Sequence, residues 1–181
     1  MSVSGLVALV FGVLGVWLTI RQSIWCWPAG LVAVVVSILE FYNQRLYGDM
    51  SLQLVYFVAG AYGWIYWNKN KNDSFVITRT PVRLIPLLIG VTMLQATLYY
   101  YLLVLFKGDR PFLDSLLTAC SLTATYMMTK KWLENWMTWV FIDATYVLLY
   151  GLKHMWLFAV LNLLFTIVAF YGWLKWRKTA S

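Results

Sequence analysis

Two tryptophans and an aspartate in one apolar stretch are the residues whose types and spacing best suit a chemical task. They stand in the run Trp136-Met-Thr-Trp139-Val-Phe-Ile-Asp143. Positions i, i+3 and i+7 share one face of an α-helix, so both indoles and the carboxylate should point the same way. Asp143 then lies roughly 10 Å along the helix axis from Trp136. Two aromatic plates and a buried anion would hold a flat cationic ring by stacking, cation–π attraction and charge pairing.

Trp136 and Asp143 also have structural interpretations. Trp136 lies at the start of its apolar stretch, where tryptophan commonly anchors a helix at the headgroup level of a membrane. Asp143 could instead pair with a tyrosine or a buried basic group, but no Lys or Arg is expected at its depth. Ionisable groups at membrane depth are costly and usually functional. We therefore interpret Asp143 and Trp139 as site residues and include Trp136, with an interfacial anchor as its alternative role.

Other polar side chains inside apolar stretches extend the candidate site. Gln53 and Asn162 can each donate and accept hydrogen bonds, as hydroxyl or amide groups of a solute require; their alternative role is hydrogen bonding between helices. Glu40 is either a site residue or a solvated charge near a helix end. The predicted substrate-binding set is Trp136, Trp139, Asp143, Gln53, Asn162, Glu40, Asn43 and Tyr146.

The elements that must position these residues are predicted to be membrane helices. Of the 181 residues, 62% are hydrophobic and 12% charged, whereas soluble domains are about half apolar and a quarter charged. A spanning helix needs roughly 20 apolar residues. Seven such spans are expected, at 3–20, 28–47, 50–67, 83–105, 112–129, 135–151 and 154–174. The first has no cationic segment before it and no cleavage site, so a retained helix is expected. The predicted fold class is an all-α integral membrane protein.

The basic residues predict the orientation, because loops on the inner side of a membrane carry an excess of Lys and Arg. With the N-terminus outside and the C-terminus inside, ten of the 14 basic residues lie inside. The four that remain outside are Arg45, Lys107, Arg110 and Lys153.

A shift of the chain by 109 residues superimposes its last part on its first without a gap. Trp27 falls on Trp136, and 62–67 (YGWIYW) falls on 171–176 (YGWLKW). A shared YGWxxW that closes two three-span units favours an internal duplication. Since three is odd, the span near 83–105 restores a common orientation, which predicts a 3+1+3 plan with parallel repeats and a substrate site at their interface. The expected divisions are 1–69 for the first unit, 70–109 for the linker and fourth helix, and 110–181 for the second unit.

The two predicted repeats differ inside. Under the same shift, Trp139 corresponds to Gly30 and Asp143 to Val34, while Glu40 corresponds to Leu149. A scaffold that is symmetric outside and asymmetric within suits an asymmetric solute. The terminal tryptophans of both units are interpreted as interfacial anchors; they are Trp64, Trp67, Trp173 and Trp176.

Other classes of site find no support in the sequence. The net charge of +7 follows the ends of apolar segments and does not form a nucleic-acid-binding face. Cys26 and Cys120 show no paired spacing, and His154 is the only histidine. Phosphate-binding loops, metal motifs and nucleophile motifs are missing. We expect no enzyme activity, no catalytic or metal-ligating residues and no cofactor.

The WxxWxxxD run, the two YGWxxW segments and the 3+1+3 plan together resemble the PnuC family of bacterial vitamin transporters. The resemblance spans essentially the whole chain and implies a SWEET-like topology, a place in the bacterial inner (plasma) membrane and homotrimers. It also implies uptake of a water-soluble vitamin by facilitated diffusion, with trapping through a cytosolic kinase. The family motif is WxxWxxxN in nicotinamide riboside transporters, where the tryptophans flank the substrate, and it maps onto Trp136, Trp139 and Asp143. Gln53 and Asn162 also look like family site positions.

Aspartate in place of asparagine, together with the short N-terminal region, favours the thiamine-type branch, PnuT. Thiamine carries a thiazolium and nicotinamide riboside a pyridinium, so Asp143 can pair with either. Riboflavin is uncharged and would stack without an ion pair. The prediction is a uniporter for a cationic aromatic vitamin, thiamine first and nicotinamide riboside as the alternative. A non-transporting membrane scaffold is the competing class, for which the change Asp143→Asn should matter little.

Overall fold

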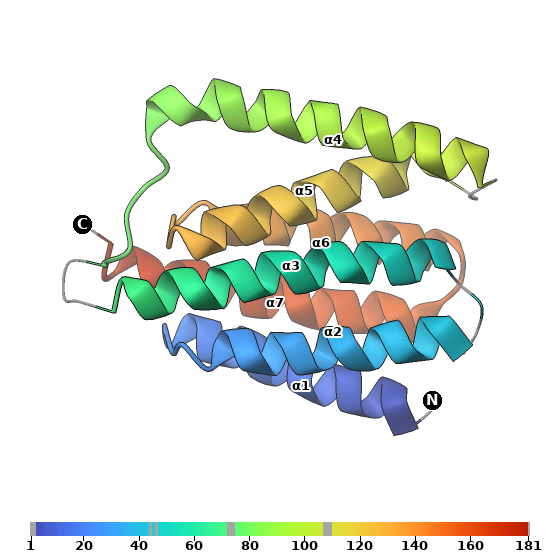
Figure 1. The fold of residues 1–181 in the computed structure, drawn as a ribbon, viewed down its shortest axis with the longest axis horizontal. Helices are drawn as coiled ribbons and strands as arrows, with labels where there is room; N and C mark the ends of the chain where they lie inside the picture. The colour runs from blue at the N-terminus through green and yellow to red at the C-terminus, as the bar shows by residue number, and fades with distance from the viewer. Residues whose placement is uncertain (1–2, 44, 46, 72–74, 107–109, 181) are drawn as a thin grey trace. The chain divides into compact units, whose positions relative to one another are not determined.

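The computed structural model describes residues 3–43, 45, 47–71, 75–106 and 110–180, and helices make up almost all of this part of the chain (Figure 1). The chain divides into two compact units, Met1–Phe75 and Val76–Ser181. The first contains α1 (Val3–Ile20), α2 (Cys26–Asn43) and α3 (Tyr47–Lys69). The second contains a short 3-10 turn (Val82–Leu84), α4 (Ile85–Leu105), α5 (Pro111–Thr129), α6 (Asn135–Leu152) and α7 (Trp156–Arg177).

These helices match the seven expected spans except for the ends of some. The expected span 28–47 is wrong at both ends, because α2 runs from Cys26 to Asn43. Pro28 is tolerated in the first helical turn, where its missing N–H would have no partner in any case. Arg45 has a φ of 59°, a left-handed conformation that cannot continue an α-helix. Tyr47 therefore opens α3 and does not close α2.

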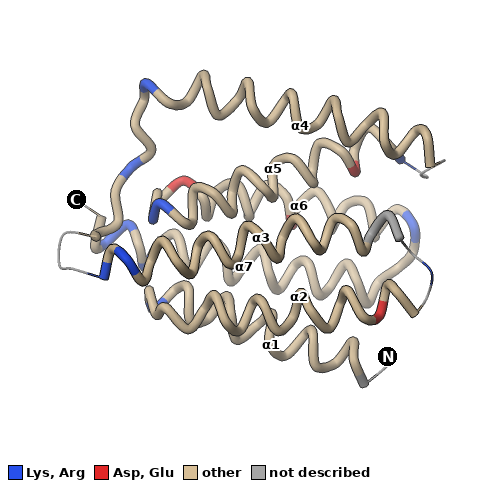
Figure 2. Tube along the Cα trace, in the orientation of Figure 1, with Lys and Arg blue, Asp and Glu red and all other residues tan. Residues whose placement is uncertain are grey.

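Apolar surface covers the outsides of these helices, as lipid requires. Three helical segments are long and apolar enough to cross a membrane by length and composition, namely Cys26–Asn43, Val82–Leu105 and Trp156–Arg177. On α4, Leu87 is 62% exposed and Leu105 is 74% exposed. Contiguous apolar surface of this kind is rare on soluble proteins. Figure 2 shows that most charged residues lie near helix ends and that the middles of the helices are nearly free of charge.

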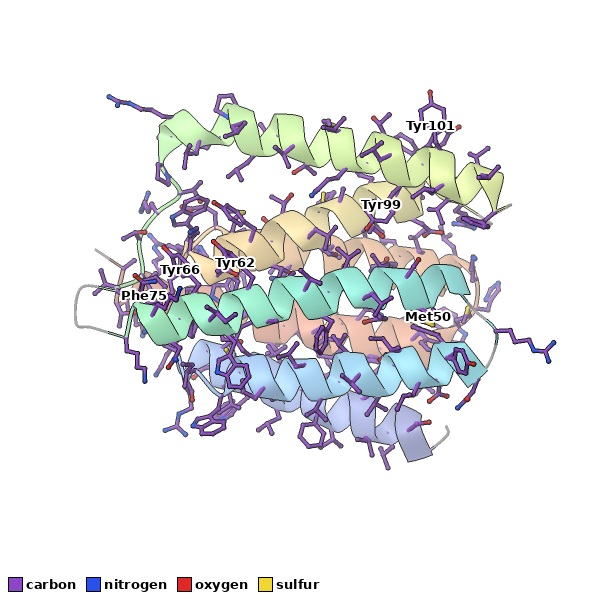
Figure 3. All side chains as sticks on the ribbon, in the orientation of Figure 1. Met50, Tyr62, Tyr66, Phe75, Tyr99 and Tyr101 are labelled. Atoms are coloured by element: carbon purple, nitrogen blue, oxygen red, sulfur yellow. The ribbon has the colours of Figure 1, made fainter. Side chains whose placement is uncertain are left out.

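In the first unit, α2 packs against both α1 and α3. Glycine permits the close approach of α1 to α2, since a Cβ on Gly15 would lie 3.5 Å from the backbone nitrogen of Gly30. At the other end of α1, Ser4 donates a hydrogen bond to the carboxylate of Glu40. At the C-terminal end of α3, Tyr66 and Phe75 are in edge contact with ring centroids 5.6 Å apart (Figure 3).

In the second unit, each long helix packs against the next along the chain, from α4 to α7. The hydroxyls of Thr92 in α4 and Thr123 in α5 lie 2.7 Å apart and share a hydrogen bond. Tyr99 is half-buried on the side of α4 that faces α5, whereas Tyr101 projects away and is 67% exposed (Figure 3). The outer face of α4 is therefore apolar, and its inner face carries the polar contacts.

The backbone turns of the two units recur at a spacing of 109 residues. In the described residues, the non-glycine positions with positive φ are Gln22 and Lys131, at 55° and 54°, and Arg45 and His154, at 59° and 55°. The hydrogen bonds agree as well. The amide of Gln22 donates to the carbonyl of Thr19 over 2.9 Å, and that of Lys131 donates to the carbonyl of Met128 over 3.0 Å. Corresponding residues thus adopt corresponding turn conformations, within each unit by itself.

The segment before α4 forms a strap, residues 76–80, on the turn between α5 and α6. Thr78 makes a parallel bridge with Trp132, and the amide of Leu133 donates to the carbonyl of Thr78 over 2.9 Å. The amide and the hydroxyl of Thr80 both donate to Oε2 of Glu134, each over 2.7 Å. Ile77 is buried beneath the strap. The counterpart of this turn in the first unit, residues 23–25, ends in Trp25, which is 66% exposed.

The hydrogen bonds of Thr80 should stabilise the second unit measurably. Thr80→Val removes the hydroxyl donor and leaves Glu134 with the amide alone, so a loss of about 1.5 kcal/mol is expected, because hydrogen bonds to charged groups are the stronger kind. The thermal unfolding midpoint in detergent should fall by a few degrees. Thr97→Val is the matched control, because the Thr97 hydroxyl donates only to the carbonyl of Met93 in its own helix, over 2.9 Å. Equal shifts in the two variants would contradict this account of the strap.

Candidate functional site

One face of α6 carries the WxxWxxxD residues together. Trp136 is buried, and Trp139 and Asp143 are half-buried. Met137, Phe141 and Leu148 fall on the opposite face by helical geometry, and all three are exposed. The burial pattern therefore agrees with the expected common face, which at this end of the second unit points inward.

Trp136 begins this face in a tightly packed position. Its ring meets that of Trp176 edge-on, with centroids 5.4 Å apart and an interplanar angle of 89°. Gly172 lies against the flat of the same ring, because a Cβ built there would approach ring carbons of Trp136 to 2.7 Å. No described residue accepts a hydrogen bond from the indole N–H of Trp136. Packing alone therefore fixes this indole.

The first unit contains the same arrangement. Trp27 meets Trp67 edge-on at 5.6 Å and 86°, and a Cβ on Gly63 would approach ring carbons of Trp27 to 2.3 Å. The interpretation of Trp67 and Trp176 as interfacial anchors is wrong, since both are buried. Their indoles are used in helix packing, which leaves no surface for headgroups.

Trp64 and Trp173, the other two tryptophans of the YGWxxW segments, remain compatible with an interfacial position. Trp64 is exposed, and Trp173 lies 5.0 Å from the guanidinium of Arg177 in a cation–π contact. An indole at the headgroup level with a basic neighbour is typical of membrane interfaces.

Asp143 lies near the middle of α6, about 10 Å along the axis from Trp136. Among the described residues, no side chain hydrogen-bonds to or forms an ion pair with its carboxylate. An ionisable group at this depth is expensive unless it is paired. The structural alternative, a tyrosine or basic partner within the chain, thus finds no support in the described part of the second unit.

Trp139 marks the difference between the units. Its counterpart Gly30 allows the close approach of α1 to α2 through Gly15. In the second unit the corresponding pair is Ala124, which is fully buried, and Trp139. An indole in place of a hydrogen prevents helices from meeting as Gly15 and Gly30 do. The second unit therefore presents a half-buried aromatic plate where the first has a helix contact.

Asn162 and Tyr146 are also half-buried in the second unit. The side-chain amide of Asn162 donates to the carbonyl of Phe158, one turn earlier in α7, over 2.8 Å, and its carbonyl oxygen remains available as an acceptor. The ring of Tyr146 stacks on that of Tyr150, with centroids 5.8 Å apart. Tyr146 thus extends the aromatic face of α6 beyond Asp143, and its role in binding stays a prediction.

Three of the predicted site residues belong to the first unit. Gln53 is half-buried on α3, and Asn43, the last residue of α2, is exposed. Glu40 is half-buried and accepts the hydrogen bond from Ser4. This contact gives Glu40 a structural role that the sequence did not reveal. The binding roles of Gln53, Glu40 and Asn43 stay predictions.

Comparison with known proteins identifies the family. The model of the family described as "Nicotinamide mononucleotide transporter" matches residues 2–178. The nicotinamide riboside transporter PnuC of Escherichia coli K12 is 24% identical over 202 aligned positions, which cover 96% of this chain and 84% of that protein. The PnuC of Neisseria mucosa is 22% identical, with 95% and 71% covered.

A third relative has a different named substrate, and a solved structure supports the fold. The riboflavin/roseoflavin transporter RibM of Streptomyces davaonensis is 26% identical, over 77% of this chain and 68% of that protein. The crystal structure of the vitamin B3 transporter PnuC superimposes with a TM-score of 0.76 at 21% identity, covering 97% of this chain and 80% of that one. With seven helices whose outer faces are apolar and a family match over nearly its whole length, this chain belongs to the nicotinamide mononucleotide transporter (PnuC) family of multi-pass inner-membrane vitamin transporters.

Proposed function

We propose that this chain is a uniporter for a water-soluble vitamin with a cationic aromatic ring, and that thiamine is its substrate. The observation that carries the proposal is Asp143, a carboxylate at mid-helix with no partner among the described residues, on the same face of α6 as Trp139. A flat cation would supply the missing charge partner and stack on the indole. Asp143 stands where the nicotinamide riboside transporters carry asparagine, and this difference is the reason for placing thiamine first.

Nicotinamide riboside is the second candidate, because relatives from two organisms carry that name. Its pyridinium could pair with Asp143 as the thiazolium of thiamine would. Its ribose needs hydrogen-bonding partners, which the amides of Gln53 and Asn162 could supply. Riboflavin, named for a further relative, has no charge to offer a carboxylate.

The proposal includes a duplicated scaffold and an orientation. The corresponding positive-φ turns and the two Trp–Gly–Trp packings support a pair of repeats in a 3+1+3 plan, with α4 as the intervening helix. In the second unit, the strap joins the start of α4 to the α5–α6 turn, and Trp136 joins that turn to the end of α7. Seven basic residues lie at this end, namely Arg79, Arg83, Lys130, Lys131, Lys175, Arg177 and Lys178. The positive-inside rule then puts this end in the cytoplasm.

Transport in this proposal needs no coupling ion. A monovalent cation gains about 2.3 kcal/mol for each 100 mV on entering a negative interior. Phosphorylation by a cytosolic kinase would then trap the vitamin as an anion. Assembly as a homotrimer is part of the same proposal, and the exposed apolar face of α4 is one surface that lipid or a second copy could cover.

The first test is a titration of the purified protein with thiamine, nicotinamide riboside and riboflavin, followed by intrinsic tryptophan fluorescence. Trp139 should report a ring that stacks on it. Saturable quenching at the lowest concentration is expected for thiamine. Quenching by the riboside alone would transfer the proposal to the second candidate. Silence with all three would remove the case for a vitamin site while leaving the fold intact.

The change Asp143→Asn should weaken binding of the cationic vitamin by roughly tenfold or more, which corresponds to about 1.4 kcal/mol. The amide keeps the shape of the side chain but removes the charge. Asp114→Asn is the matched control, because Asp114 carries the same charge in the first turn of α5 of the same unit. Affinity should be measured by calorimetry for each variant. An unchanged affinity in Asp143→Asn would favour a scaffold or an uncharged substrate.

Uptake into proteoliposomes should follow the membrane potential. At 100 mV, negative inside, the cation should accumulate roughly 50-fold at equilibrium, as expected from about 2.3 kcal/mol. Without a potential, uptake should stop at equal concentrations, even when a sodium or proton gradient is present. The measurement is radiolabelled vitamin inside vesicles with the potential set by potassium and valinomycin. Uphill accumulation driven by an ion gradient at zero potential would contradict the uniport mechanism.

A further inference from the structure

The Trp–Gly–Trp packing occurs once in each unit, and only one copy adjoins the candidate site. In the second unit it consists of Trp136, Gly172 and Trp176, which we call the α6–α7 clamp. In the first unit it consists of Trp27, Gly63 and Trp67, the α2–α3 clamp. Both sets of indoles are buried. The two clamps are therefore equivalent as packing devices.

No hydrogen bond orients the central indole of either clamp. The N–H groups of Trp27 and Trp136 are both buried, and neither has an acceptor among the described residues. A buried donor without a partner is destabilising, and here it occurs at the corresponding position of both units. Shape alone thus determines where each ring lies, and the glycine is the closest element of that shape.

A side chain at the glycine would move the indole. Real Cβ atoms essentially never come within 3.0 Å of such neighbours, and an alanine at 172 would place its Cβ 2.7 Å from Cε3 and Cζ3 of Trp136. Those atoms belong to a rigid fused ring, so the whole ring must rotate or α6 must shift away from α7. Trp139 follows on the same face three residues later, and Asp143 four residues after that. Either movement changes the spacing between the aromatic plates and the carboxylate.

The same clash in the first unit has nothing to disturb. Gly30 and Val34 stand where the second unit has Trp139 and Asp143. Displacement of Trp27 by an alanine at 63 would strain the packing of α2 on α3 but would move no aromatic plate or carboxylate of the WxxWxxxD face.

From this asymmetry we infer that Gly172 and Trp176 are positioning residues for substrate binding, which act through Trp136, whereas Gly63 and Trp67 have a purely structural role. The inference rests on the proposed function, because it needs Trp136, Trp139 and Asp143 to form a ligand site. It assigns to α7 the task of setting the geometry of a site carried on α6.

The test compares Gly172→Ala with Gly63→Ala in the full-length protein. Thermal midpoints in detergent should fall in both variants. The affinity for the vitamin that binds the unaltered protein best should weaken roughly tenfold or more in Gly172→Ala, and should stay within about twofold in Gly63→Ala. Equal losses of affinity in both, or unchanged affinity in a folded Gly172→Ala protein, would overturn the inference. Absence of binding in the unaltered protein would overturn the proposed function itself.

A second pair of variants keeps the test informative where Gly172→Ala fails to fold. Trp176→Phe retains an aromatic edge but leaves space beside Trp136, and Trp67→Phe does the same beside Trp27. Only Trp176→Phe should weaken binding, by several-fold. A double-mutant cycle of Gly172→Ala with Trp136→Phe adds a readout that simple destabilisation would not produce. The smaller ring relieves the clash, so the alanine should cost less affinity in that background, and strict additivity would count against the clamp.

Discussion

Lipid offers no hydrogen bonds, and this constraint accounts for most of the polar side chains within the helices. Serine and threonine hydroxyls repeatedly donate to the carbonyl four residues earlier in their own helix. Thr19 does so in α1, Ser37 in α2 and Thr166 in α7, and α5 contains a succession of three, Ser121, Thr125 and Thr129. Such groups satisfy themselves and need no partner on another helix. Against this background an acidic group at mid-helix stands out, because a carboxylate cannot donate to its own helix.

Duplication explains the scaffold, and departures from it explain the chemistry. A rigid outer plan needs the same close contacts in both units, and the paired glycines beneath indoles meet that need. The inner positions are free to differ, because an indole or a carboxylate there alters one unit only. Gly30 against Trp139 is the clearest example, since the same backbone position closes a helix contact in one unit and exposes an aromatic plate in the other.

The sequence was sufficient to predict the seven helices and the common face of the WxxWxxxD residues, because both depend on local hydrophobic length and helical spacing. It could not place the end of α2, since the left-handed turn at Arg45 has no glycine to signal it. The burial of Trp67 and Trp176 was missed because tryptophan is equally at home in an interface. The signal was present nonetheless. Glycine stands five residues before a tryptophan partner's segment end in both YGWxxW repeats, and each repeat has its Trp27 or Trp136 counterpart. The strap could not be foreseen, because a polar stretch with a few apolar residues, such as Ile77, gives no sign of pairing with a turn 54 residues later.

The strap also bears on the order in which the protein is made. Every contact of the first unit lies within the first 75 residues, so all its partners exist before α4 has left the ribosome. Thr80 must wait for Glu134, which is synthesised after the whole of α4 and α5. The segment that leads into α4 therefore inserts with its final partner still missing. A nascent chain that stops short of α6 contains a complete three-helix unit followed by two helices whose connection to it has not yet been fastened.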